Sequence, residues 1–202
     1  TTTATKYLGT HECPANQAKQ AQMLRTQCNN FARVINSSHL TRRETQCFYW
    51  AIYRLSANYA LPTTHFTFDA LHKIQTKAHS AMVARSGYCK NTAHEVVHGP
   101  RFLGGAGFFH LYDDQGYGQL KMFMKHWRSP SSQPGKLLRI TMAWAQYTVG
   151  TSTPLLEDVS SKLPHNEALW LDSLREFLRS VHGTIKLVDP PIVPPQRTND
   201  IY

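Results

Sequence analysis

The segment from residue 15 to residue 85 carries three successive amphipathic helical patterns, and these constrain the fold more than any other feature of the chain. Apolar residues recur in each pattern at spacings of three and four, which gives each helix one apolar stripe. Because only short loops separate the patterns, an antiparallel bundle is the economical arrangement. The predicted fold is therefore mainly α, with a three-helix bundle first and a second helical subdomain after it.

Each of the three helices has recognisable ends. The first is predicted from about residue 15 to Ile35. The second opens with Thr41-Arg42-Arg43-Glu44, which is typical of a capping box. The third begins near Thr67 and ends near Gly87. We expect the second helix to bury one face, made of Phe48, Ala51, Ile52, Leu55 and Tyr59.

Further helical patterns follow in the second half of the chain. A short helix is predicted over residues 92–97, and the glycine-rich residues 99–108 are expected to be irregular. Asp113 is expected to cap a helix that contains Trp127. After a loop over residues 129–135, helices are predicted over 136–148 and 166–181. Residues 185–188 have a strand-like composition.

A short strand-like run, Lys6-Tyr7-Leu8-Gly9, precedes the helices. No partner strand is expected nearby, and an unpaired strand leaves backbone groups without hydrogen bonds. We therefore expect residues 1–13 to be the end of an upstream domain. The predicted organisation then comprises a bundle over residues 14–90, a second helical region over 91–188, and a proline-rich tail over 189–202.

The charge of the chain is unevenly distributed. The formal net charge is +9, and residues 1–140 hold 17 of the 22 lysines and arginines but only 6 of the 13 acids. A basic region of this kind suits a polyanionic partner such as nucleic acid. The candidate phosphate-binding residues are Arg42, Arg43, Arg54, Lys73, Lys77, Arg85, Lys90, Arg101, Lys121, Lys125 and Arg128.

Cysteine usage and hydropathy narrow the cellular setting. The four cysteines form no C-x-x-C pair, which predicts reduced thiols in an intracellular protein. No apolar run approaches the length needed to span a membrane, so no membrane partner is expected. No motif indicates a small-molecule substrate.

His94-Glu95-Val96-Val97-His98 matches the H-E-x-x-H zinc motif. On a helix both histidines share one face, and Glu95 can act as general base. A zinc hydrolase also needs a third ligand, for which Asp113 or Asp114 are the candidates. The alternative interpretation leaves the two histidines at a polar surface while the valines pack inward.

Two further motifs favour structural interpretations. Tyr112-Asp113-Asp114 lacks the residue that polymerases place between the tyrosine and the paired aspartates, and its context predicts a helix start. Residues 104–108 are glycine-rich but lack the Gly-Lys-Ser/Thr of a phosphate loop. The prolines between residues 190 and 195 leave open a third possibility, in which a helical scaffold binds a protein through this tail.

The order of these elements resembles the part of a reverse transcriptase that follows its palm domain. The residues that carry the resemblance are the Lys6–Gly9 strand, the long helix, and the Thr41-capped helix with its aromatics. They continue with the Gly99-Pro100 to Phe108 segment, Gln115-Gly116 and the basic run Lys125–Arg128. The most similar type is the reverse transcriptase of non-LTR retrotransposons, an RNA-directed DNA polymerase.

The resemblance implies specific roles for these segments. Lys6, Tyr7, Leu8 and Gly9 match the primer grip, the bundle corresponds to the thumb, and the region from Gly99 corresponds to the connection. The family's catalytic carboxylates and their Mg²⁺ belong to the palm, which no stretch of this chain matches. The resemblance therefore implies a fragment that positions an RNA–DNA or DNA duplex beside an upstream palm, without catalysis of its own. It is compatible with a nuclear location.

Overall fold

The computed structural model describes residues 5–7, 10–12, 17–89, 91–151, 153–164, 166 and 168–188. The described part is mainly helical, as predicted. The chain divides into two compact units, Thr1–Gln115 and Gly116–Tyr202. The boundary predicted after residue 90 differs from this division. Residues 91–115 belong to the first unit, in which the Leu111 N–H donates a hydrogen bond to the Gln75 side chain.

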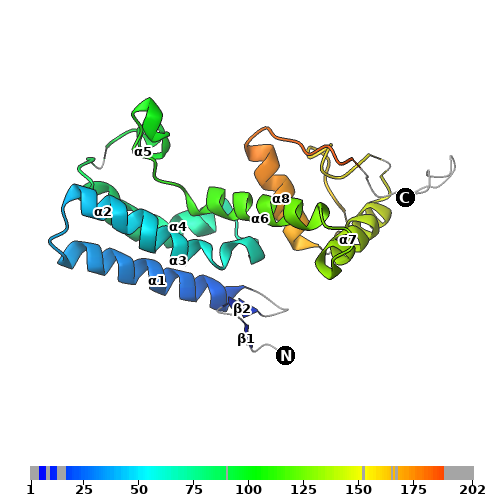
Figure 1. Cartoon of the computed structure of the whole chain (residues 1–202), viewed down its shortest axis with the longest axis horizontal. Coiled ribbons are helices and arrows are strands. Elements are labelled where there is room, and N and C mark those ends of the chain that lie inside the picture. Colours follow the sequence, from blue (N-terminus) through cyan, green and yellow to red (C-terminus); the bar gives the residue numbers. More distant parts are fainter. Residues whose placement is uncertain are drawn as a thin grey trace. The chain divides into compact units, whose positions relative to one another are not determined.

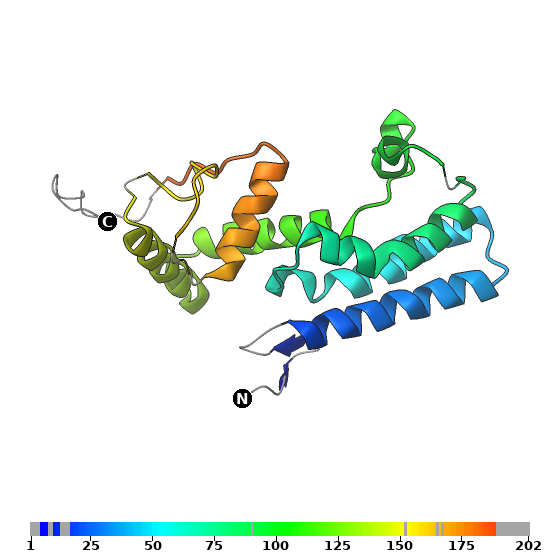
Figure 2. The same ribbon diagram turned by 180° about the vertical axis from the view of Figure 1, so that it is seen from behind.

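Three helical stretches form the body of the first unit (Figure 1). They are α1 (Ala18–Ser37), the continuous run of α2 (Arg42–Phe48), η1 (Tyr49–Tyr53) and α3 (Arg54–Asn58), and α4 (Phe68–Arg85). The 3₁₀ turn η2 (Leu61–Thr63) leads from α3 to α4. Gln17 bonds to His65 at one end, and Arg85 bonds to the carbonyl of Ser38 at the other. Successive stretches therefore run in opposite directions, which Figure 2 shows from behind.

The predicted buried face of the second helix is wrong. The structure buries Thr45, Tyr49, Tyr53 and Ala57 instead, whereas Leu55 is 67% exposed. The cause is the π-helix η1, whose wider turn keeps residues four apart on one face. The Tyr53 hydroxyl meets the sulfur of buried Cys28, so the polar tip of the ring also finds a partner inside the unit.

The predicted helix starts of the bundle are confirmed at their caps. The Thr41 hydroxyl accepts a hydrogen bond from the Glu44 backbone N–H, and the Glu44 carboxylate accepts one from the Thr41 N–H. The Thr67 hydroxyl caps α4 in the same way by accepting from the Ala70 N–H. After α4, Gly87 has a φ of +93°, the left-handed conformation expected after a helix end.

The expectation of an unpartnered strand near the N-terminus is also wrong. β1 (Thr5–Tyr7) pairs antiparallel with β2 (Thr10–Glu12), and Lys6 lies opposite His11. The partner is thus supplied within a few residues by a local hairpin. Sequence reasoning missed it because the second strand is only three residues long.

Residues between the bundle and the second unit contain short elements. They are α5 (His94–His98), the 3₁₀ turn η3 (Arg101–Leu103) and the beginning of α6 (Leu111–Trp127). Because α6 starts at Leu111, Asp113 lies in its first turn and is not the cap that the sequence suggested. The irregular segment predicted over residues 99–108 is interrupted only by η3.

The second unit packs the end of α6 against α7 (Gln133–Val149) and α8 (Leu169–Ser180). α7 begins earlier than predicted, because Ser132 caps it by accepting a hydrogen bond from the Gly135 N–H. The core of the second unit contains Phe123, Trp127, Met142, Ala145, Leu155, Leu156, Leu171, Leu174, Leu178 and Leu187. Gly116 lies directly against the Phe177 ring, since a Cβ there would stand 2.1 Å from it.

The strand-like stretch at residues 185–188 is not a strand, which corrects that prediction. Ile185 makes a backbone hydrogen bond to the Leu156 carbonyl, and Leu187 is buried in the core of the unit. The apolar residues of this stretch therefore pack against a loop and have no sheet to join. Among the described residues, no helix has the length and apolar character that crossing a membrane requires.

Candidate nucleic-acid interface

One end of the bundle gathers three of the predicted basic residues. Arg42 and Arg43 open α2, and Arg85 closes α4. The Arg85 guanidinium donates to the Ser38 carbonyl, and the Arg42 side chain covers Gly87. These contacts place Arg42 and Arg85 at the end where α1 ends, α2 begins and α4 ends. Lys90 lies outside the described residues.

Lys73 and Lys77 lie four residues apart on the exposed side of α4. The buried residues of this helix are Leu71, Ile74, Gln75, Ala78, Met82 and Val83, and they occupy other faces. Two like charges at this spacing disfavour the helix by a few tenths of a kcal/mol, roughly. An anion bound across the pair would remove that cost.

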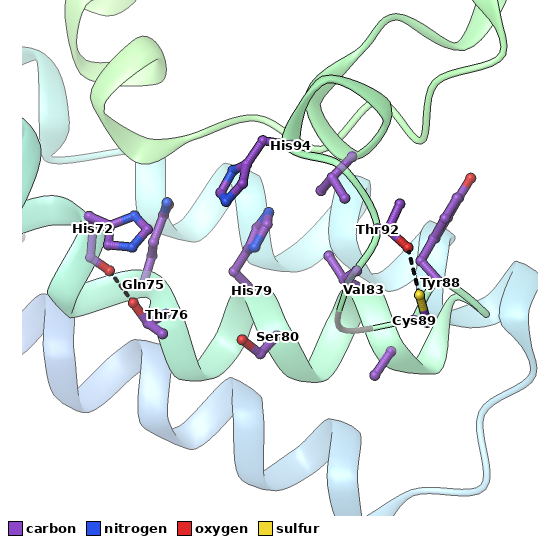
Figure 3. Close-up of a pocket in the computed structure, with 12 residues that line it drawn as sticks. His72, Gln75, Thr76, His79, Ser80, Val83, Tyr88, Cys89, Thr92 and His94 are labelled. Carbon is purple, nitrogen blue, oxygen red and sulfur yellow. Dashed lines mark hydrogen bonds between the residues drawn. The ribbon is translucent and has the colours of Figure 1, made fainter.

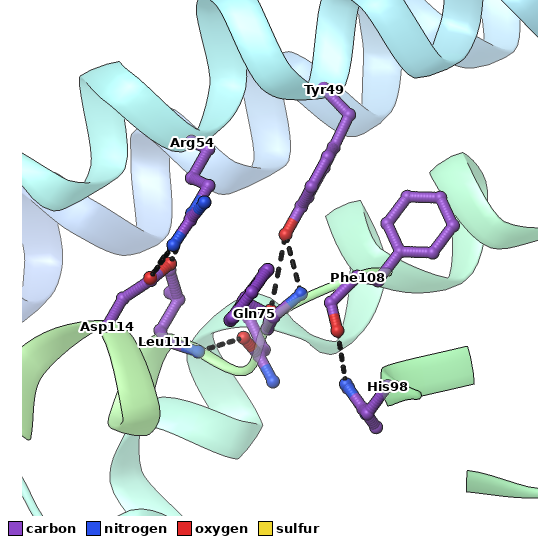
Figure 4. Close-up of polar contacts among 8 residues, drawn as sticks. Tyr49, Arg54, Gln75, His98, Phe108, Leu111 and Asp114 are labelled. Atoms are coloured by element: carbon purple, nitrogen blue, oxygen red, sulfur yellow. Dashed lines mark hydrogen bonds and ion pairs between the residues drawn. The ribbon is translucent and has the colours of Figure 1, made fainter. Parts of the chain in front are cut away.

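Arg54, which the sequence analysis placed among the phosphate-binding candidates, forms an ion pair within the first unit. Its guanidinium forms an ion pair with Asp114, with Nη2 and Oδ1 2.7 Å apart (Figure 4). The guanidinium also stacks over the Phe109 ring, 4.0 Å from its centroid. Asp114 has only 3% of its side chain exposed. Arg54 therefore neutralises a buried carboxylate and ties α3 to the start of α6.

Arg101 lies in η3 and is exposed, but its side chain is partly engaged. Its Nε donates to the Ala106 carbonyl, and its guanidinium lies 5.4 Å from the Trp50 ring centroid. Two arginines thus contact the Trp50 ring, because the Arg54 guanidinium lies 4.9 Å from its centroid as well.

The second unit holds the remaining basic candidates. Lys121 and Lys125 are exposed on α6, four residues apart, and Arg128 follows the helix. Within the part of the chain that the structure describes, Arg54 is the one arginine or lysine in an ion pair with a carboxylate. The other described candidates therefore form no ion pair with a carboxylate of the described residues.

The primer-grip-like residues are described only in part. Lys6 and Tyr7 lie in β1, whereas Leu8 and Gly9 lie outside the described residues. Within the described part of the hairpin, Lys6 lies opposite His11 and Tyr7 lies opposite Thr10.

The H-E-x-x-H motif forms α5, a helix of only five residues. The His94 and His98 rings stack with their centroids 5.7 Å apart, and His98 Nδ1 donates to the Phe108 carbonyl at 2.8 Å. Among the described residues, no group of three or more histidine, cysteine, aspartate or glutamate side chains is arranged to hold a metal ion. The structure thus brings neither Asp113 nor Asp114 to this pair as a third ligand, and Asp114 is held by Arg54.

The two histidines of this motif belong to a cluster of five, together with His72, His79 and His110, which the sequence analysis did not predict. His79 stacks on His98 with ring centroids 5.1 Å apart, and His72 stacks on His110 at 5.5 Å. Burial, reinforced by the neighbouring imidazoles, lowers the pKa of His79 to about 4 and that of His110 to about 3. His79 and His110 are therefore neutral at pH 7.

Hydrogen bonds define the tautomers of two rings in the cluster. The Tyr112 N–H donates to His110 Nδ1, so the His110 proton lies on Nε2. That nitrogen lies 3.3 Å from His72 Nδ1, which must then accept. His110 is consequently neutral, which agrees with its lowered pKa.

A pocket of about 470 Å³ lies beside the cluster, between α4, α5 and the turn that follows α4 (Figure 3). No carboxylate lines it. Its lining residues are His72, Gln75, Thr76, His79, Ser80, Val83, Ala84, Tyr88, Cys89, Thr92, His94 and Val97. The residues come from segments up to 25 positions apart, so no local sequence signal identifies the pocket.

Buried glutamines hold the loops of the first unit, a role that the sequence analysis did not predict. Gln115 Oε1 accepts from the Thr64 hydroxyl and from the Phe66 N–H, while its Nε2 donates to the Phe66 carbonyl. Gln75 Oε1 accepts from the Leu111 N–H (Figure 4). In a helical pattern such residues resemble surface positions, so only the structure identifies them.

The glycine-rich segment is a compact turn, as expected. The Ala106 and Phe108 N–H groups bond to the Val96 and Val97 carbonyls, and a Cβ at Gly105 would stand 2.1 Å from the Gly99 carbonyl oxygen. Two parts of the backbone approach each other closely there, which only glycine permits. The segment carries Phe108 into the core against Tyr49.

No protein-family model matches the sequence, and comparison with curated proteins and with solved structures gives no match.

Proposed function

We propose that this chain binds a nucleic-acid duplex of the primer–template kind through contacts to phosphates. One observation carries the proposal. The exposed cations of both units, other than Arg54, have no carboxylate partner among the described residues. Counterion release from the phosphate backbone would then supply most of the affinity, largely without sequence preference.

The resemblance of the sequence to the thumb and connection of non-LTR reverse transcriptases supports the same proposal. It suggests an RNA–DNA or DNA duplex as the ligand and a palm domain as the neighbouring part of the parent protein. The proposal assigns no catalytic step to this chain. The proposed contacts are Arg42, Arg43, Lys73, Lys77, Arg85, Arg101, Lys121, Lys125 and Arg128, with Arg54 left out because of its ion pair.

The test is the affinity for a labelled RNA–DNA duplex at about 50 mM and about 200 mM salt. Phosphate contacts predict a fall of at least about tenfold over this range. The Lys73→Glu/Lys77→Glu variant should bind at least about tenfold more weakly at the lower salt concentration, because two attractive contacts become repulsive.

A matched control is available in the last third of the chain. Lys162 and Lys186 are also exposed, and the Lys162→Glu/Lys186→Glu variant changes the net charge by the same amount. We expect it to bind nearly as well as the unaltered chain. A flat salt dependence would overturn the proposal. Equal weakening by the two double variants would overturn the assignment to α4.

A further inference from the structure

Helix α7 exposes an apolar stripe that no described residue of the second unit covers. Leu137, Ile140, Trp144 and Tyr147 are 63%, 64%, 61% and 66% exposed, and they share one face of the helix. The opposite face buries Met142 and Ala145 in the core of the unit. A helix that is apolar on both faces has a second packing partner to find.

The stripe is free of charge along its whole length. α7 contains no acidic residue, and its two cations are Lys136 and Arg139. Arg139 is directed inward, where it donates to the Trp127 carbonyl and lies 4.2 Å from the Trp127 ring centroid. The positions that flank the stripe include Thr141, Ala143 and Thr148. An approaching helix would therefore meet no buried charge.

The stripe is also symmetric in sequence about Met142. Leu137 and Tyr147 lie at equal distances from that residue, and so do Ile140 and Trp144. Two copies of α7 packed antiparallel on a two-fold axis would place each aliphatic side chain opposite an aromatic one. The single exposed cation, Lys136, would then fall opposite Thr148 of the other copy, so like charges stay apart.

From these observations we infer that α7 is a self-association surface, on which the chain forms an antiparallel two-fold dimer through Leu137, Ile140, Trp144 and Tyr147. A hollow of about 300 Å³ borders the Trp144 side of the stripe and is lined in part by Thr141, Thr148 and Trp170. The surface is therefore grooved and can accept side chains from the second copy.

The area of the stripe indicates how strongly the two copies are expected to associate. Burying these four side chains in both copies removes roughly 1,000 Å² from water, which is near the lower limit for specific interfaces. A weak dimer follows, with a dissociation constant of about 10–100 μM. Sedimentation velocity of the full 202-residue chain between about 1 μM and 200 μM covers this range.

Substitution of a leucine tests the surface against a matched control. Leu137→Glu should weaken self-association at least tenfold, because it places carboxylates in the contact. Leu137 is exposed on α7 and lies outside the core of the unit, so the fold is retained. Leu103→Glu changes an equally exposed leucine, 74% exposed in η3, and should leave self-association unchanged.

Charge complementation tests the identity of the partner. Ile140→Glu/Trp144→Glu and Ile140→Lys/Trp144→Lys should each be monomeric alone and should form a heterodimer when mixed. For the register, the exposed cysteines Cys47 and Cys89, and Cys13, are first replaced by serine. In that background a mixture of Leu137→Cys and Tyr147→Cys chains should form a disulfide faster than either chain alone.

Three results would overturn the inference. The first is a chain that stays monomeric up to about 200 μM, and the second is equal weakening by Leu137→Glu and Leu103→Glu. The third is the absence of a heterodimer when the oppositely charged variants are mixed, with circular dichroism showing that both are folded. A partner other than a second copy would give the first result.

Discussion

Arg54 holds the carboxylate of Asp114 inside the first unit, and removing the guanidinium leaves that carboxylate buried without its partner. We expect Arg54→Met to lower the free energy of unfolding by about 3 kcal/mol. The double variant Arg54→Met/Asp114→Leu should recover much of the loss, because no unpaired charge remains. Urea unfolding measures both, and equal destabilisation by the single and double variants would contradict this role.

The histidine cluster should make the stability of the chain depend on pH. The pKa of His79 is lowered from 6.5 to about 4, chiefly by burial and further by His98, His94 and His72. The unfolded chain takes up a proton as the pH falls below 6.5, while the folded chain keeps the ring neutral. The contribution of His79 to the free energy of unfolding is therefore complete above pH 6.5 and is lost as the pH falls toward 4.

A substitution at His79 isolates this effect. His79 Nε2 is buried and makes no hydrogen bond, so His79→Phe removes a titratable group without losing a partner for that atom. We expect the variant to be at least as stable as the unaltered chain at pH 7 and to lose less stability between pH 6.5 and pH 5. Urea unfolding at a series of pH values checks this, and an unchanged slope would contradict it.

At the scale of elements, the π-helix η1 decides which side of the second helix is buried. Tyr53→Ala should lower the free energy of unfolding by about 3–5 kcal/mol, because it empties a buried site against Cys28. Leu55→Ala, two residues away, should change it by less than about 0.5 kcal/mol. Comparable losses in the two variants would show that the helix buries the face that the sequence suggested.

The elements that the sequence predicted well are those with local signals. The Thr41 and Thr67 caps and the stripe of α1 depend on residues within one or two turns, so their spacing alone was informative. The prediction of the buried face of the second helix was wrong because a π-helix changes which residues share a face, and composition does not indicate a π-helix. The pairing of β1 with β2 was not predicted because strands of three residues show too little alternation of apolar and polar residues to be recognised.

The sequence allowed the charged and exposed residues of the candidate site to be predicted, but not the residues that they contact. Lys73 and Lys77 are exposed, as their positions on the third helical pattern indicated. The ion pair between Arg54 and Asp114 joins residues 60 positions apart in the sequence, and no local pattern predicts such a pair. The same reason hid the histidine cluster, whose members come from α4, α5 and the segment before α6.

At the scale of the whole molecule, two separate cores divide the chain into units that we expect to open independently. The second unit depends on one buried arginine. Arg175 Nη1 donates to the Leu155 and Asp158 carbonyls, and Nη2 donates to the Ser161 carbonyl, so one side chain holds the loop over residues 155–161 against α8. The sequence analysis predicted no role for Arg175.

Arg175→Met should therefore weaken the second unit selectively, because several backbone carbonyls lose their shared donor at once. Hydrogen exchange measured along the chain is the appropriate readout, since it reports each helix separately. We expect amide protection to fall in α7 and α8 while α1 and α4 keep theirs. The cations of α4 would then remain on an intact scaffold, so binding of an RNA–DNA duplex should persist in part. An equal loss of protection in all four helices would mean instead that the chain unfolds as a single cooperative body.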